Sequence, residues 1–222
     1  MDPTAQAVIE AHYLPSIQYF SKLAHYPMVW IEQHEHYEKR SYRNRCHIAG
    51  SNGLIRLSIP LLKGKNQQQN IQDTQIAFHE PWMNQHWSSI QSAYGNAPFF
   101  EYYAEALGSL YQQPIHSLFQ WNLKLLELLL RFIPLETTIR LTETYQKVLP
   151  EQIADLRNTI QPKSTHQKVD HHFHPVAYPQ VFSEKHGFSP NLSILDLLFC
   201  TGPQAILYLE QSWVASPKTD GI

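Results

Sequence analysis

The chain is poor in cysteine, glycine and charged residues, on which several classes of protein depend. It contains two cysteines and eight glycines among 222 residues, and charged residues make up only 16%. Cys46 and Cys200 can form neither a disulfide framework nor the paired-cysteine motif of a structural zinc site. So few glycines also argue against a Gly-rich phosphate-binding loop. Side chains would therefore have to supply most of the contacts to any bound phosphate.

Targeting and membrane segments are missing from the pattern as well. Residues 1–10 carry acids, whereas a secretory signal begins with basic residues and an apolar run. The best membrane candidate, Leu123–Leu135, is too short to span a bilayer and is interrupted by charges. We expect a cytoplasmic protein without a membrane span. No motif identifies a cofactor, and the oligomeric state cannot be read from the sequence.

The charge that is present lies unevenly along the chain. The net charge of -2 argues against a protein that wraps a nucleic-acid backbone. Yet residues 37–65 contain seven basic residues and a single acid, while residues 66–123 contain no Lys or Arg. Such segregation is typical of a face that meets an anion, although a solvated ribbon of strands would give the same pattern. We expect a small anionic or sugar-linked ligand and no nucleic acid.

Hydrophobic periodicity predicts an α/β fold in a single domain spanning residues 1–222. Two apolar segments of strand length flank a short helix, which is the spacing of a parallel β-α-β unit. We expect a small mixed sheet with this N-terminal unit, flanked by helices. The expected strands are 7–13, 28–32, 44–48, 54–60, 71–78 and 137–142. The expected helices are 16–24, 82–94, 99–111, 115–133, 151–160 and 191–199, and residues 161–180 are expected to form a long loop.

Two local signals support these elements. Asn52-Gly53 between two apolar segments indicates a β-hairpin. Ser193 and Asp196 fit a capping box at the start of the last expected helix, in which the carboxylate reaches back to a free backbone N–H.

A first group of chemically useful side chains follows the second expected strand, where parallel sheets gather their ligands. It contains Glu32, His34, Glu35 and His36. On an extended chain the two imidazoles would share a face, so that they could bind a metal together with an outside carboxylate. One of them could instead act as a general base. Hydrogen-bonding or ligand-orienting roles are the commoner use of such residues.

A second group, Lys39–Arg45, is basic. If this segment is extended, Arg43 and Arg45 lie on one side of it, in phase with Tyr37. Two guanidinium forks suit a phosphate or a carboxylate, because each fork binds such a group through two hydrogen bonds. An exposed strand that carries charge for solubility is the alternative.

Two further groups have weaker signals. Asp170–His174 holds three histidines that could bind a metal, but no further ligand stands at a diagnostic distance, so a solvated loop fits better. Trp82 and His86 recur on one helix face and could line a pocket, although such a stripe is more often core. We therefore predict no metal site.

The order of the segments resembles the WbqC-like protein family, in a short form. Ala11–Phe20 resembles the family's opening pattern, in which an aromatic residue and proline precede a Tyr-Phe pair. Glu32–Arg45 resembles its acidic stretch that ends in Asn-Arg. The family's later motifs match Ile59–Leu61, Trp82–Pro98 and Pro190–Asp196. A family stretch with Asn-Pro and paired glycines is replaced here by the His-rich loop.

The resemblance implies a bacterial protein, since the family is named for O-antigen gene clusters, but the family is functionally uncharacterised. Gene context implies a transferase of a glycyl, acyl or related group in surface-polysaccharide biosynthesis. Its substrate would be an anionic or nucleotide-linked sugar. Two alternatives remain, namely a non-catalytic anion-binding or scaffold protein and a metal-dependent hydrolase that uses His171–His174.

On this interpretation the site lies where the ends of the first two strands meet the basic segment. We expect the general base among His12, Glu32 and His34. Arg43, Arg45 and Lys39 would bind the anion, and Asn44 and Tyr37 would orient the substrate. The full set of expected substrate contacts is Tyr37, Lys39, Arg43, Asn44, Arg45, Trp82 and His86. Convergence of these side chains in one concave site would favour an enzyme, and scatter would favour a scaffold.

Overall fold

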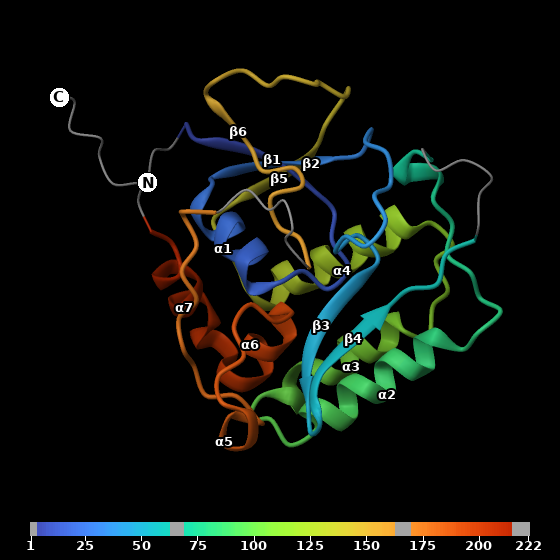
Figure 1. Ribbon diagram of the computed structural model, residues 1–222, viewed down its shortest axis with the longest axis vertical. Helices are drawn as coiled ribbons and strands as arrows, with labels where there is room; N and C mark the ends of the chain where they lie inside the picture. The colour runs from blue at the N-terminus through green and yellow to red at the C-terminus, as the bar shows by residue number, and fades with distance from the viewer. Residues whose placement is uncertain (1–3, 63–68, 163–169, 215–222) are drawn as a thin grey trace.

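The computed structural model describes residues 4–62, 69–162 and 170–214. Four parallel strands form one sheet in the order β5-β2-β1-β6, and an antiparallel hairpin, β3–β4, lies apart from it. The strands are β1 Gln6–Glu10, β2 Met28–Glu32, β3 Arg45–Gly50, β4 Gly53–Ser58, β5 Thr138–Leu141 and β6 Ile153–Asp155. Figure 1 shows the sheet at one end of the molecule, with the helices gathered on one side of it.

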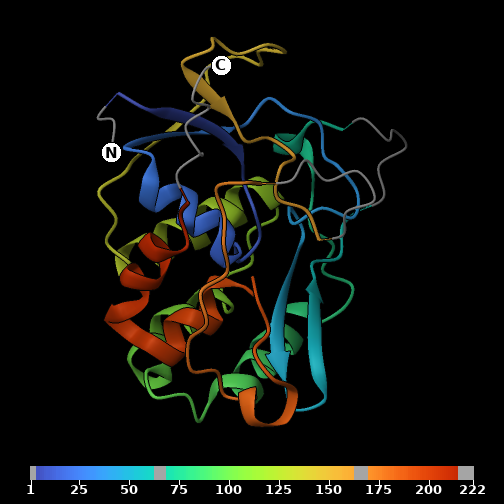
Figure 2. The same cartoon turned by 60° about the vertical axis from the view of Figure 1, so that its left-hand side comes forward.

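The helical elements pack mainly on one side of the sheet. They are α1 Ile17–His25, η1 Ile71–Asp73, α2 Trp82–Tyr94, α3 Phe100–Leu110, α4 Leu118–Phe132, α5 Ser183–His186, α6 Ile194–Thr201, η2 Gly202–Gln204 and α7 Ala205–Gln211. In Figure 2 the hairpin lies beside the helical layer, and β3 packs against α2 and α6. No helix within the described ranges is long and apolar enough to cross a membrane.

The predicted α/β class and the N-terminal β-α-β unit are confirmed. β1 and β2 pair in parallel, with Gln6 opposite Met28 and Glu10 opposite Glu32. Between them α1 begins after Ser16, whose side chain accepts a hydrogen bond from the backbone N–H of Tyr19. The mixed strand directions that we expected are present, but they are divided between the two sheets.

The predicted helix at 151–160 is wrong. Residues Ile153–Asp155 instead form β6, which pairs in parallel with the outer edge of β1. Three residues are too few to show a period of two in the sequence. The pairing is imposed by the tertiary structure, because it provides hydrogen-bonding partners for an edge that β1 would otherwise expose.

The predicted strand at 71–78 is also wrong. The side chain of Asn70 accepts from the backbone N–H of Gln72 and starts the 3₁₀ turn η1 instead. Only isolated bridges follow, at Gln75 and Ile76. Part of the expected loop 161–180 lies outside the described residues.

The expected capping box is half correct. Ser193 accepts from the backbone N–H of Leu195 and caps α6. The carboxylate of Asp196 is drawn into the core, where it accepts hydrogen bonds from Tyr94 at 2.8 Å and Tyr178 at 2.6 Å. Two buried hydroxyls therefore outweigh the local cap. The helix expected to be last is followed by η2 and α7.

The C-terminal end of the described chain is fixed to α1 by a stack of three rings. Trp213 lies between His25, with ring centres 3.5 Å apart, and His172, at 4.8 Å. The Lys22 ammonium stands 4.5 Å from the same indole and 2.6 Å from the Asp170 carboxylate. Burial, with the nearby His172 and Lys22, lowers the pKa of His25 to about 4.

Acid should destabilise the protein through His25. The folded-state pKa of about 4 lies below the ordinary value of 6.5, so the unfolded chain takes up the proton first as pH falls. The stability is therefore complete above about 6.5 and is lost toward pH 4. Urea unfolding should show a smaller acid-induced loss for His25→Phe, which keeps a stacked ring without a titrating nitrogen. The control His79→Phe, at an exposed imidazole, should match the wild type; equal losses in all three proteins would contradict the assignment.

Candidate functional site

The two central strands give the sheet two unlike faces. Their register pairs Val8 with Trp30 and Glu10 with Glu32, and residues paired in this way project to the same side. The alternate residues, such as Ile9, are fully buried in the core formed with the helices. The opposite face therefore carries an indole and two carboxylates near the carboxyl ends of parallel strands, where α/β sheets bind their ligands.

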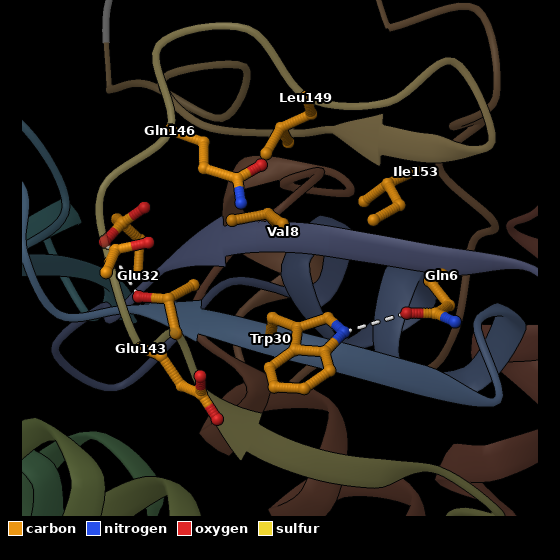
Figure 3. A pocket seen from close by; sticks show the side chains of 10 residues that line it. Gln6, Val8, Trp30, Glu32, Glu143, Gln146, Leu149 and Ile153 are labelled. Carbon is orange, nitrogen blue, oxygen red and sulfur yellow. Dashed lines mark hydrogen bonds between the residues drawn. The ribbon is translucent and has the colours of Figure 1, made fainter.

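A pocket of about 290 Å³ opens on this face. Figure 3 shows the indole of Trp30 between Gln6 and two carboxylates, Glu32 and Glu143. The indole Nε1 donates a hydrogen bond of 2.9 Å to the side-chain oxygen of Gln6, which fixes the orientation of the ring. The other residues that line the pocket are Val8, Thr142, Thr144, Gln146, Leu149 and Ile153.

Glu32 is held in place at one end of this pocket. One of its oxygens accepts from the Thr142 hydroxyl at 2.8 Å and from the backbone N–H of His34 at 2.9 Å. The other lies 3.4 Å from Arg157 Nη1. The imidazole of His34 is oriented by a 3.1 Å contact between its Nε2 and the carbonyl of Thr142. Thr142 therefore positions both of these predicted residues.

A second charged cluster lies at the end of β1, around the buried guanidinium of Arg43. The guanidinium forms a fork on Glu35, from Nε at 2.7 Å and from Nη2 at 2.5 Å. Its Nη1 stands 3.8 Å from the carboxylates of both Glu10 and Glu38. Arg43 is 1% exposed, so its charge is neutralised inside the protein.

The pKa values of two carboxyl groups around Arg43, those of Glu10 and Glu35, are shifted in opposite directions. Burial alone would raise the pKa of Glu10, but the charge of Arg43 and the hydrogen bond from His12 outweigh it and lower the pKa to about 2. Burial raises the pKa of Glu35 to about 7 despite its fork with Arg43, and the neighbouring Glu10 and Glu32 add to that rise. The cluster therefore carries one firmly ionised carboxylate and one that titrates near neutral pH.

His12 belongs to this cluster and is shielded from solvent. Its Nε2 lies 3.1 Å from Glu10, and the rings of Tyr19 and Tyr42 pack on it, with centres 4.9 and 5.6 Å away. Burial lowers the pKa of His12, which keeps the ring neutral. Its Nδ1 is buried with no hydrogen-bond partner among the described residues.

Of the residues predicted from the sequence, Glu32 lines the pocket and His34 contacts Thr142 beside it, whereas His12 and Arg43 belong to the second cluster around Glu10. The predicted residues are therefore divided between two places and do not converge in one concave site. The others lie elsewhere: Lys39 is exposed, and the amide of Asn44 donates to the carbonyl of Ile59. Tyr37 and Arg45 are half-buried and do not line the pocket. Trp82 and His86 belong to an aromatic core with Tyr13, Tyr111 and Trp121.

Several residues of the site are absent from the predictions made on the sequence. Glu10 was hidden because the expected first strand ran past it, to residue 13. Trp30 stands in the apolar run Met28–Ile31, which has no apolar/polar alternation to show that the strand has two unlike faces. Arg157 and Thr142 lie far along the chain, and only the placement of β5 and β6 brings them to the pocket.

The described parts of the chain contain no cluster of three or more His, Cys, Asp or Glu side chains suited to a metal ion. His172 is instead used in the stack on Trp213. The metal-dependent hydrolase alternative therefore has no support from this geometry.

Removal of the Arg43 guanidinium should lower the stability of the protein far more than removal of the Arg45 guanidinium. Arg43→Ala leaves two buried carboxylates without their cation, so the free energy of unfolding should fall by about 3–5 kcal/mol. Arg45→Ala, at a half-buried guanidinium without a carboxylate fork, should cost about 1 kcal/mol or less. Urea unfolding measures both, and similar small losses would show that Arg43 does not hold the cluster together.

Comparisons with known proteins agree with the resemblance seen in the sequence. The model of the WbqC-like protein family matches residues 10–167 and 162–208. The chain is 27% identical over 226 residues to the uncharacterized protein Rv1507c of Mycobacterium tuberculosis, a match that covers 91% of this chain and 96% of that protein. No solved structure matches the chain. Because the family model matches residues 10–208, which is most of the chain, the chain belongs to the WbqC-like protein family.

Proposed function

We propose that the protein is a transferase of a glycyl, acyl or related group that acts on a sugar in surface-polysaccharide biosynthesis. The observation that carries the proposal is that Trp30 and Glu32 project from the same face of β2 into one pocket. An aromatic platform beside a fixed carboxylate suits a ring that has both an apolar face and polar substituents. A pyranose is such a ring.

The size and lining of the pocket fit a single sugar unit. Its volume of about 290 Å³ is at the low end for small-molecule sites. The C–H face of a pyranose would lie on Trp30, whose ring is fixed by Gln6. Hydroxyl groups would meet the polar groups of Glu143, Thr144 and Gln146, which are exposed on the opposite rim.

An anionic group on the substrate would meet Arg140. This guanidinium stands 5.8 Å from the ring of Trp30, and Arg140 is exposed. It forms no ion pair with any described acid, whereas Arg43 is already surrounded by carboxylates. We therefore assign the phosphate of a nucleotide-linked sugar to Arg140. Arg140 does not line the pocket itself, but it is paired in register with Trp30, which does. The roles predicted for Arg45 and Lys39 remain predictions, since neither lines the pocket nor is paired with a residue that does.

Glu32 is our choice for the general base. It would accept the proton from the acceptor's hydroxyl or amine while that atom attacks the group to be transferred, and the leaving group would depart from the same carbon. Its position is fixed by Thr142 and Arg157, as a base must be positioned before the reaction. His34 would keep Thr142 in place. His12 is enclosed by tyrosine rings, so it is poorly placed for substrate contact.

One observation favours the alternative of a non-catalytic binding protein. Both oxygens of Glu32 already have protein partners, and the residue is only 1% exposed. A carboxylate in this condition could serve to hold the pocket together without taking part in a reaction. Binding and turnover must therefore be measured separately.

Ligand binding should depend on Trp30. A panel of UDP-, dTDP- and GDP-linked hexoses is screened by thermal shift, where a ligand at about a hundred times its dissociation constant adds about 2.7 kcal/mol. For the best compound, Trp30→Ala should weaken binding by about tenfold or more in calorimetric titration. The control Tyr102→Ala removes an exposed aromatic ring on α3 and should bind normally. Absence of any shift across the panel, or equal binding by both variants, would remove the sugar site.

Turnover should depend on Glu32. Glu32→Gln keeps the shape of the side chain but cannot take up a proton at neutral pH, so the rate should fall by about 10²–10⁴-fold while binding changes little. Product formation is measured with the nucleotide-linked hexose found by the screen as the acceptor and with activated acyl or glycyl donors added. The control Glu136→Gln lies on the exposed surface before β5 and should retain full rate. Normal turnover by Glu32→Gln would rule out its role as the base, and binding without turnover in the wild type would support the non-catalytic alternative.

A further inference from the structure

The pocket is covered by the connection between β5 and β6. Figures 1 and 3 show this connection passing over the face of the sheet that carries Trp30. Residues 143–148 are all exposed, yet Glu143, Thr144, Gln146 and Leu149 also line the pocket. The segment therefore closes the pocket on one side while its outer side faces solvent.

This segment is fixed firmly only at its ends. Thr142 at its start is held by three contacts with Gln33 and His34. At its end, the backbone N–H of Ile153 donates to the carbonyl of Pro150. Between them, residues 143–149 are joined to other described residues by one hydrogen bond, in which the Gln146 carbonyl accepts from Arg157 Nη1 at 2.8 Å.

Arg157 makes that hydrogen bond from a guanidinium that is anchored elsewhere. Its Nε and Nη2 donate to the carboxylate of Asp155 on β6, at 2.8 and 2.7 Å. Its Nη1 faces both the Gln146 carbonyl and, at 3.4 Å, the carboxylate of Glu32. The guanidinium also stands 5.0 Å from the ring centre of Tyr145. Its side chain is only 7% exposed, although its neighbours on the connection are exposed.

The division of these contacts has a mechanical consequence. The fork on Asp155 holds the guanidinium on the sheet whether or not the connection is in place, because both partners belong to β6 and the residues after it. The connection is attached only through Nη1 and through the Tyr145 ring. It can therefore lift while Arg157 stays close to Glu32.

We propose that residues 143–149 form a lid over the pocket and that Arg157 is the clasp that holds the lid closed. Because the same Nη1 faces Glu32, Arg157 is a positioning residue that links the closed lid to the carboxylate inside the pocket. This proposal shares one assumption with the proposed function, namely that the pocket binds a ligand. Opening of the lid can be tested without one.

Lys147, exposed in the middle of the lid, provides a direct readout. Trypsin can cut after Lys147 only when the lid departs from the sheet far enough to enter the protease, so the rate of that cut reports the open population. The full chain is digested for short times under native conditions, and mass spectrometry identifies the fragments that end at Lys147. Arg157→Gln removes the charge and the fork, whereas Arg157→Lys keeps a charge but cannot reach Asp155, Gln146 and Glu32 together. Arg131→Gln, at an exposed arginine of α4, is the matched control.

We expect the cut after Lys147 to be about tenfold faster in Arg157→Gln than in the wild type, because a charge-assisted hydrogen bond is lost. Arg157→Lys should be intermediate, and Arg131→Gln should be unchanged. If Arg157→Gln does not fold, Tyr145→Ala is used instead; it removes only an exposed ring from the clasp and should speed the cut severalfold. Equal rates after Lys147 in the folded variants and the wild type would overturn the proposal. Faster cutting together with no response to any nucleotide-linked hexose would leave the lid standing and refute the sugar site.

Discussion

The buried guanidinium of Arg43 is the interaction on which the arrangement of the sheet and the hairpin depends. Its side chain binds Glu35, Asn158 and the neighbourhood of Glu10, which come from three separate parts of the chain. Its backbone carbonyl accepts a 2.7 Å hydrogen bond from Asn122 in the middle of α4. One residue therefore ties the ends of the first two strands to the loop after β6 and to the longest described helix. Two of the carboxylates, Glu10 and Glu35, are buried with this cation and depend on it for their neutralisation, whereas Glu38 is half exposed.

The sequence predicted the regular elements well where local chemistry decides them. The β-α-β unit, the hairpin at Asn52-Gly53 and the helix beginning at Trp82 each have a period or a cap that needs no tertiary information. It failed where pairing partners decide. β6 exists because β1 has a free edge, and Asp196 abandons its expected cap because two buried tyrosines offer their hydroxyls.

The same division applies to the candidate site. Glu32, His34 and Arg43 were selected from the sequence because ligands gather at the ends of parallel strands and because charge stands out in a chain that has little of it. Arg43 was expected to bind an anionic ligand, which requires a guanidinium without a carboxylate partner. In the structure, Glu10 and Glu35 neutralise its charge. The pairing of Arg43 with Glu10 was not evident, since a carboxylate that ends a strand looks the same in sequence whether it faces solvent or a buried cation. Trp30 and Arg157 required the register of the sheet and the path of the β5–β6 connection.

The two faces of the central sheet are subject to different packing constraints. Ile9, Val29 and Ile31 are buried in the core, so their substitution by residues of a different volume would lower the stability of the protein. The face with Gln6, Trp30 and Arg140 contributes little to that core, and its cover is a single connection with few anchors. Members of one family could therefore diverge in what they recognise while they inherit the same helical layer unchanged. Comparison of relatives would then show slow change on one side of each strand and fast change, or lineage-specific patterns, on the residues in between.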